Sequence, residues 1–103
     1  MKRKERKTLE EIKKILKENQ AVLREKFKVK EMGIFGSFVR GEQKKKRSDL
    51  DILVEFEEPI SLLEFVVLEN HLSEIIGEKV DLVMKSALKP RIGKHILEEV
   101  IYI

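Results

Sequence analysis

Three aspartates are the residues of this sequence best suited to chemistry. Of 19 acidic residues only Asp49, Asp51 and Asp81 are aspartates, and each falls in an apolar, β-branched run. Aspartate is disfavoured in strands and costly to bury, and a local violation of such rules often marks a functional site. Because strand side chains alternate, Asp49 and Asp51 share one face while Leu50 and Ile52 face the core. If the strand of Asp81 pairs beside theirs, three carboxylates converge.

Such a carboxylate cluster predicts a cation site. Two unit charges ~4 Å apart at an effective dielectric of ~20 repel by about 4 kcal/mol, so the cluster requires protons or cations. The chain has no cysteine, and oxygen-only ligands favour Mg²⁺ or Mn²⁺. Two ions bridged by the carboxylates would suit phosphoryl or nucleotidyl transfer.

Gly36-Ser37 supplies the complementary part, a place for phosphate. The pair ends a predicted strand and begins a helical turn, where backbone N–H groups and a hydroxyl can face an anion. Alone, Gly-Ser is more often a simple strand-to-helix connection. Together with the aspartates it predicts a site for a nucleoside triphosphate.

The elements that must position these residues follow from capping and periodicity. Thr8 with Glu11 forms a capping box before a helix, and Ser61 with Glu64 forms another. The whole pattern predicts a helix over residues 9–26, strands over 29–35 and 50–56, a helix over 62–76, a strand over 79–84, a helix over 90–99 and a short strand at 101–103. The predicted class is α/β (α+β), one mixed sheet with helices packed on one face, in a single domain over residues 1–103.

Composition narrows the function classes. The chain has 103 residues, of which 42% are apolar, and lacks both cysteine and an apolar run near the ~18 residues of a membrane span. We therefore expect a soluble, cytoplasmic protein without membrane contact. The 22 basic residues nearly balance the acidic ones, and one tyrosine without tryptophan offers little base stacking, so nucleic-acid binding is disfavoured.

With these residues placed, the chain resembles the minimal nucleotidyltransferases of the DNA polymerase beta-like superfamily over nearly its whole length. Gly36 and Ser37 match the family's Gly-Ser motif, and Asp49 and Asp51 match its Asp-x-Asp pair. Asp81 matches the later strand carboxylate. The resemblance implies the polymerase beta-like fold and nucleotidyl transfer.

The resemblance also assigns roles. Asp49 and Asp51 would ligate two Mg²⁺ ions, with Mn²⁺ as a substitute, and Asp81 would bind the catalytic ion and orient or deprotonate the acceptor. Gly36-Ser37 would hold the β- and γ-phosphates of ATP. Arg40 would either reach a phosphate or brace the loop.

Minimal members of this family are commonly encoded beside a helical HEPN-domain protein and act as its antitoxin by adenylylating a tyrosine. The resemblance therefore implies transfer of AMP from ATP to a hydroxyl of a HEPN partner. The alternative is a catalytically inactive binding module that neutralises its partner by occlusion, using the strongly apolar helix over 62–76. No role is assigned to Lys44–Arg47, His71, His95 or Tyr102.

Overall fold

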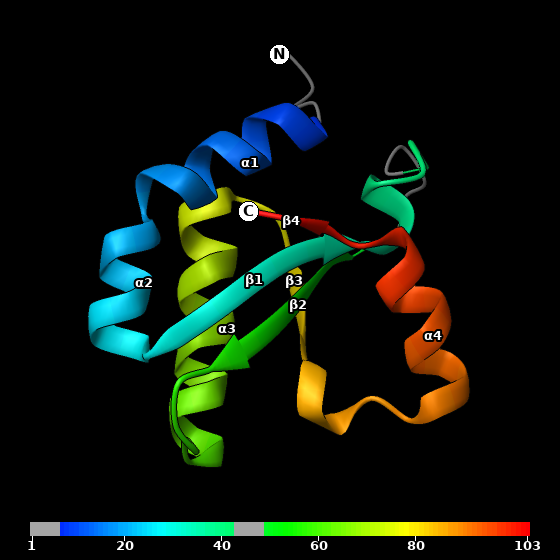
Figure 1. The fold of residues 1–103 in the computed structure, drawn as a ribbon. Coiled ribbons are helices and arrows are strands. Elements are labelled where there is room, and N and C mark those ends of the chain that lie inside the picture. Colours follow the sequence, from blue (N-terminus) through cyan, green and yellow to red (C-terminus); the bar gives the residue numbers. More distant parts are fainter. Residues whose placement is uncertain (1–6, 43–48) are drawn as a thin grey trace, which may run out of the picture.

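The chain folds around a small β-sheet flanked by helices (Figure 1). The computed structural model describes residues 7–42 and 49–103, so the loop Lys44–Arg47 lies outside the described residues. The elements are α1 (Leu9–Glu18), α2 (Gln20–Phe27), β1 (Val29–Phe35), the 3₁₀ turn η1 (Gly36–Phe38), β2 (Leu50–Phe56), α3 (Leu62–Ile76), β3 (Val80–Met84), the 3₁₀ turn η2 (Lys85–Ala87), α4 (Pro90–Glu99) and β4 (Ile101–Tyr102).

The sheet is mixed, as predicted. Its strand order is β3-β2-β1-β4. Strand β1 is antiparallel to both β2 and β4, whereas β2 and β3 are parallel. A parallel pair needs a crossover connection, and α3 provides it.

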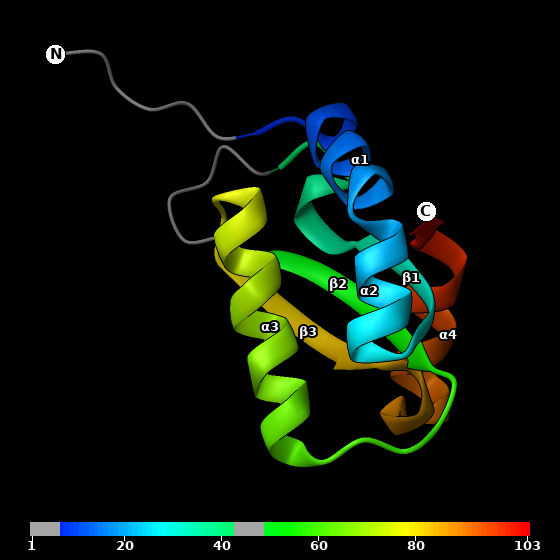
Figure 2. The same ribbon diagram turned by 90° about the vertical axis from the view of Figure 1, so that its left-hand side faces the viewer.

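The main core lies between the sheet and the first three helices, which cover one of its faces (Figure 2). Strand β2 shows how the sequence builds it, because Leu50, Ile52 and Val54 alternate with Asp51 and are fully buried, as predicted. The other buried members of this core are Ile12, Leu16, Leu23, Val29, Met32, Ile34, Phe38, Leu68, Leu72, Ile76, Val80 and Leu82.

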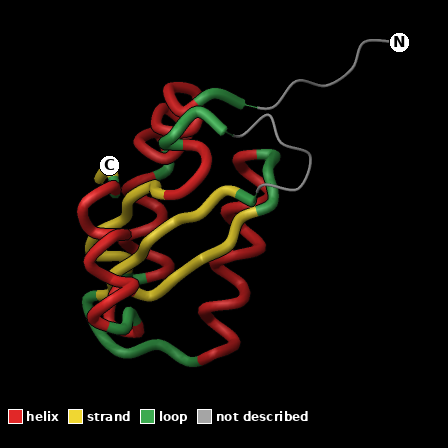
Figure 3. The backbone as a smooth tube through the Cα atoms, turned by 90° about the vertical axis from the view of Figure 1, so that its right-hand side faces the viewer, coloured by secondary structure: helices red, strands yellow, loops and turns green. Residues whose placement is uncertain are grey.

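Helix α4 contributes none of these buried core residues and lies on the side of the sheet opposite α3 (Figures 2 and 3). The prediction of helices on one face therefore holds for α1, α2 and α3 but not for α4, which precedes the strand β4 at the β1 edge of the sheet. On this side the segment after α4 passes close to β1. Gly33 is buried there, and a side chain at its position would meet Val100 and Tyr102. Phe35 and Leu53 are buried as well but stand apart from the main core. The C-terminal segment therefore lies close to the end of β1, where Gly36 follows.

Most element boundaries agree with the sequence, but the prediction of one helix over residues 9–26 was wrong. Both capping boxes are formed, and Gly77 ends α3 in the left-handed conformation. The first helix breaks at Asn19, whose φ is −100° and ψ is 4°. The Asn19 side chain donates a hydrogen bond to the Ile15 carbonyl at 2.8 Å. Asparagine inside a helix competes for backbone groups in this way, so α2 starts in a new direction.

Candidate functional site

Asp51 is the centre of the site, because the sheet register places it between the two other motifs. It pairs with Phe35, the residue before Gly36, on one side and with Asp81 on the other. The predicted pairing of the two aspartate-bearing strands is thereby confirmed. Asp49 precedes β2 by one residue. All three carboxylates lie where the parallel strands begin, at the end of the sheet where β1 finishes.

The carboxylates act on one another electrostatically. Burial raises the pKa of Asp51 to about 6, and the charges of Asp81 and Asp49 push it in the same direction. Burial also raises the pKa of Asp81, assisted by Glu69 and Asp49. Arg40 opposes the shift at Asp51. A positive charge placed among these groups would therefore relieve repulsion that the folded chain itself creates.

Gly36 lies directly against the carboxylate of Asp51. Its φ is +81°, in the left-handed region, and an added Cβ would collide with Asp51 Oδ2. Only glycine satisfies both conditions without strain. After it the chain turns tightly, because Val39 and Arg40 donate their backbone N–H groups to the Gly36 carbonyl. The Ser37 hydroxyl makes no hydrogen bond to any described residue.

Glu99 joins this site although the sequence analysis did not single it out. Its Oε2 accepts a hydrogen bond from the Gly36 N–H at 2.8 Å, and its Oε1 accepts one from Arg40 Nη1 at 2.8 Å. Arg40 Nε also donates to Glu42 Oε1 at 3.0 Å. Of the two roles predicted for Arg40, bracing the loop is therefore visible in the structure. No spacing rule links Glu99 to Gly36, 63 residues away, so sequence reasoning had no signal for it.

The donor set suits a hard divalent cation. Asp49, Asp51 and Asp81 offer only carboxylate oxygens, the ligands that Mg²⁺ and Mn²⁺ prefer. The Asp51 carboxylate lies in the space that a Cβ at Gly36 would need, so the absence of a side chain there is what admits the carboxylate. Within residues 7–42 and 49–103, no three acidic, histidine or cysteine side chains are arranged to hold an ion as they stand. The metal-ligand role of the three aspartates stays a prediction.

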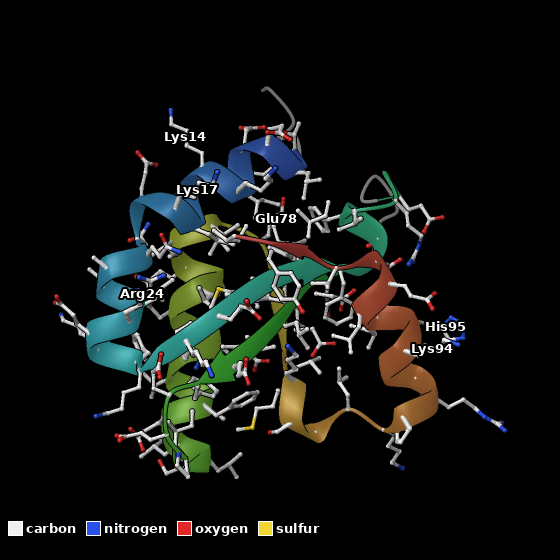
Figure 4. All side chains as sticks on the ribbon, viewed as in Figure 1. Lys14, Lys17, Arg24, Glu78, Lys94 and His95 are labelled. Atoms are coloured by element: carbon white, nitrogen blue, oxygen red, sulfur yellow. The ribbon has the colours of Figure 1, made fainter. Side chains whose placement is uncertain are left out.

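Among the described residues, His71, His95 and Tyr102 were left without a role, and none of them contacts the three aspartates or the Gly36 turn. The ring of His71 packs against Phe27 with centroids 5.2 Å apart. Arg91 and His95 are exposed on α4, and His95 points outward from the helix (Figure 4). Tyr102 is exposed on β4. None of the helices in the described parts of the chain has the length and hydrophobicity needed to cross a membrane.

Comparison with known proteins agrees with this geometry. The family model described as "Nucleotidyltransferase domain" matches residues 6–103. Protein adenylyltransferase MntA of Thermococcus cleftensis is 56% identical over 93% of this chain and 96% of its own length. A solved structure of a candidate minimal nucleotidyltransferase is 35% identical, with a TM-score of 0.69, and the match covers 87% of this chain and 93% of that one.

A third match supports the fold alone. It is a tri-AMPylated Shewanella oneidensis HEPN toxin in complex with its MNT antitoxin, 18% identical with a TM-score of 0.62 over 89% of this chain and 67% of that one. Fold and sequence together define an enzyme class, the nucleotidyltransferases. The chain belongs to the nucleotidyltransferase domain family, and within it to the minimal nucleotidyltransferases.

Proposed function

We propose that this chain is a Mg²⁺-dependent adenylyltransferase that transfers AMP from ATP to a hydroxyl group of a partner protein. The observation that carries the proposal is the pairing of Asp51 with Asp81 directly beside the Gly36 turn. The acidic side chains and the turn that we assign to phosphate thus lie at one end of the sheet. The relative from Thermococcus cleftensis, which is named a protein adenylyltransferase, supports the same activity.

Binding of the triphosphate falls to the turn after β1. The backbone N–H and the hydroxyl of Ser37 offer neutral donors to the β- and γ-phosphates. Arg40, half-exposed beside them, offers a cation. Gly36 allows the phosphates to approach the backbone closely, since it carries no side chain.

The three aspartates would hold two Mg²⁺ ions, for which Mn²⁺ can substitute. Bound there, the metal supplies positive charge to the triphosphate and makes the acceptor hydroxyl more acidic. The hydroxyl oxygen then forms a bond to the α-phosphorus, the bond to the bridging oxygen of the β-phosphate breaks, and pyrophosphate leaves. Asp81 is the more exposed of the paired carboxylates, and we assign it the hydroxyl proton.

The acceptor belongs to a partner, which we propose to be a HEPN-domain toxin modified on tyrosine. A solved neighbour is a HEPN toxin that carries AMP groups in complex with an antitoxin of this fold. The chain would then act as an antitoxin by modifying its partner.

Transfer of labelled AMP tests this function directly. The parent, incubated with α-labelled ATP, Mg²⁺ and a HEPN-domain protein as acceptor, should label that protein. Asp51→Asn should lower the rate at least about 100-fold, the size seen when one charge-stabilising group leaves an active site. Glu55→Gln is the matched control, because it neutralises an acid on the same strand outside the cluster. Equal labelling by parent and Asp51→Asn would refute the proposal.

One observation keeps the occlusion function as the second candidate. Leu62, Leu63 and Val67 are 79%, 73% and 48% exposed at the start of α3, although all three are apolar. Such a surface can bind a partner without chemistry. Co-expression separates the two functions, since an occluding module should still neutralise its toxin when it carries Asp51→Asn. A modifying enzyme should fail to neutralise while partner binding persists.

A further inference from the structure

Glu99 links the last helix to the turn that we assign to the triphosphate. It is the final residue of α4, and its side chain is 25% exposed. Each carboxylate oxygen accepts one hydrogen bond at 2.8 Å, Oε2 from the backbone of Gly36 and Oε1 from the guanidinium of Arg40. One side chain therefore holds both the peptide at the start of the turn and the cation at its end.

These contacts fix Arg40 while leaving it able to bind a ligand. Glu99 engages Nη1 and Glu42 engages Nε, so two carboxylates hold one guanidinium from different segments. No described residue accepts a hydrogen bond from Nη2, and the side chain is 50% exposed. Hydrogen bonds between ions are stronger and more directional than neutral ones, and a planar guanidinium bound on two sides keeps its orientation.

The charge of Glu99 makes its position informative. It lies near enough to Asp51 to add to the raised pKa of that carboxyl. A fixed negative charge beside a triphosphate site repels the ligand, so it should weaken ATP binding unless it also arranges the groups that bind ATP.

We propose that Glu99 is a positioning residue for nucleotide binding: it anchors the Gly36 peptide and orients Arg40 so that Nη2 of Arg40 and the turn after Gly36 face the triphosphate. The inference rests on the proposed function and adds to it a residue outside the Gly-Ser and aspartate motifs. Glu99 acts through these two groups rather than by touching the nucleotide.

The test compares dissociation constants for ATP with Mg²⁺, measured by calorimetry. Glu99→Gln should weaken binding about tenfold, as expected for the loss of one charge-assisted hydrogen bond. Glu98→Gln, the matched control on the exposed neighbouring acid, should change it less than about twofold. In a background that already carries Arg40→Gln, the further loss from Glu99→Gln should be much smaller, since coupled residues are not additive.

The direction of the effect decides between roles. Tighter ATP binding by Glu99→Gln would show that Glu99 only repels the phosphates. Unchanged binding would show that Glu99 makes no contribution to phosphate binding. Either result overturns the inference, as does full additivity with Arg40→Gln. In the transfer assay Glu99→Gln should raise KM for ATP more than it lowers kcat, whereas a loss confined to kcat contradicts positioning of the ligand.

Two further measurements keep the test sound. Denaturation midpoints show whether each variant is folded. Glu99→Asp keeps the charge but shortens the reach, so it should also weaken ATP binding, and unchanged affinity would count against the inference.

A parent protein that fails to bind ATP with Mg²⁺ refutes the proposed function and the inference with it. A parent that binds normally beside an unaffected Glu99→Gln refutes the inference alone.

Discussion

The contact between Gly36 and Asp51 limits which residues can occupy both positions. The turn needs a left-handed residue, and the carboxylate occupies the space where its side chain would stand. Because glycine is required at this position for two independent reasons, any other residue there should lower the free energy of unfolding. The Gly-Ser motif is thus tied to the aspartates by packing.

Gly36→Ala should therefore destabilise the protein by about 2 kcal/mol or more and abolish ATP binding, because strain and collision add. Gly41→Ala is the control, since Gly41 is also left-handed, with φ +75°, but no described atom lies within 4 Å of the added Cβ. It should cost about 1 kcal/mol, the backbone strain alone, and keep ATP binding. Urea denaturation of both variants measures the difference. Equal costs would contradict the collision.

The raised pKa of Asp51 predicts a pH dependence of stability in the ion-free protein. In the unfolded chain its pKa is close to the ordinary 3.8, whereas in the folded chain it is about 6. Between these values the folded state binds more protons than the unfolded state, so the free energy of unfolding falls as the pH rises. The favourable contribution is complete below about pH 4 and is lost above about pH 6.

Asp51→Asn should remove this dependence. In EDTA at pH 7 the variant should be more stable than the parent by about 1 kcal/mol, after allowance for the solvent screening of a half-buried group. At pH 4 the two proteins should be nearly equal. Urea midpoints at both pH values provide the measurement, and a variant that is less stable than the parent at pH 7 would show that the carboxylate is not under strain from its neighbours.

At the scale of elements, α3 protects the exposed edge of the sheet and so positions Asp81. Strand β3 is an edge strand. The Val80 N–H donates to Ser73 Oγ at 3.0 Å, and the Leu82 N–H donates to Glu69 Oε2 at 2.9 Å. Asp81 lies between these two anchors. Side chains that satisfy edge N–H groups also block pairing with another chain.

Two substitutions at Glu69 separate its hydrogen bond from its charge. Glu69→Ala leaves the Leu82 N–H without its acceptor and should cost about 1 kcal/mol. Glu69→Gln keeps an acceptor oxygen and removes a negative charge facing Asp81, so it should be nearly neutral in stability. Urea denaturation in EDTA distinguishes them. A similar loss in both variants would mean that the charge, rather than the hydrogen bond, supports the strand.

The elements also show how far the sequence predicts the fold. The predictions of both capping boxes and of the strands β1 and β2 were correct, because local sequence signals determine these features. The break at Asn19 was missed, because apolar spacing continues across it while a single side-chain hydrogen bond redirects the chain. Glu99 was missed for a different reason. It is one of 16 glutamates, and only the folded chain brings it to Gly36.

The whole molecule contributes to the site, since its parts come from four separate segments. The turn follows β1, Asp49 and Asp51 come from the start of β2, Asp81 from β3 and Glu99 from the end of α4. Pairing of the two aspartate strands could be anticipated from the sequence, but the approach of α4 to the turn could not. A ligand held by all these segments must stabilise the fold that brings them together.

This linkage predicts that ATP and Mg²⁺ stabilise the protein only in combination. At 100 times the dissociation constant the free energy of unfolding should rise by about 2.7 kcal/mol. ATP alone should raise the free energy of unfolding only slightly, because its negative charge is repelled by the aspartates when no cation is bound. Mg²⁺ alone should raise it less than ATP and Mg²⁺ together. Denaturation midpoints of the parent, Asp51→Asn and Glu55→Gln under the three conditions measure it. The midpoint of the control, Glu55→Gln, should rise as much as that of the parent, whereas the midpoint of Asp51→Asn should not rise. A full response to ATP in EDTA, or an equal one in Asp51→Asn, would show that the nucleotide binds without the carboxylate site.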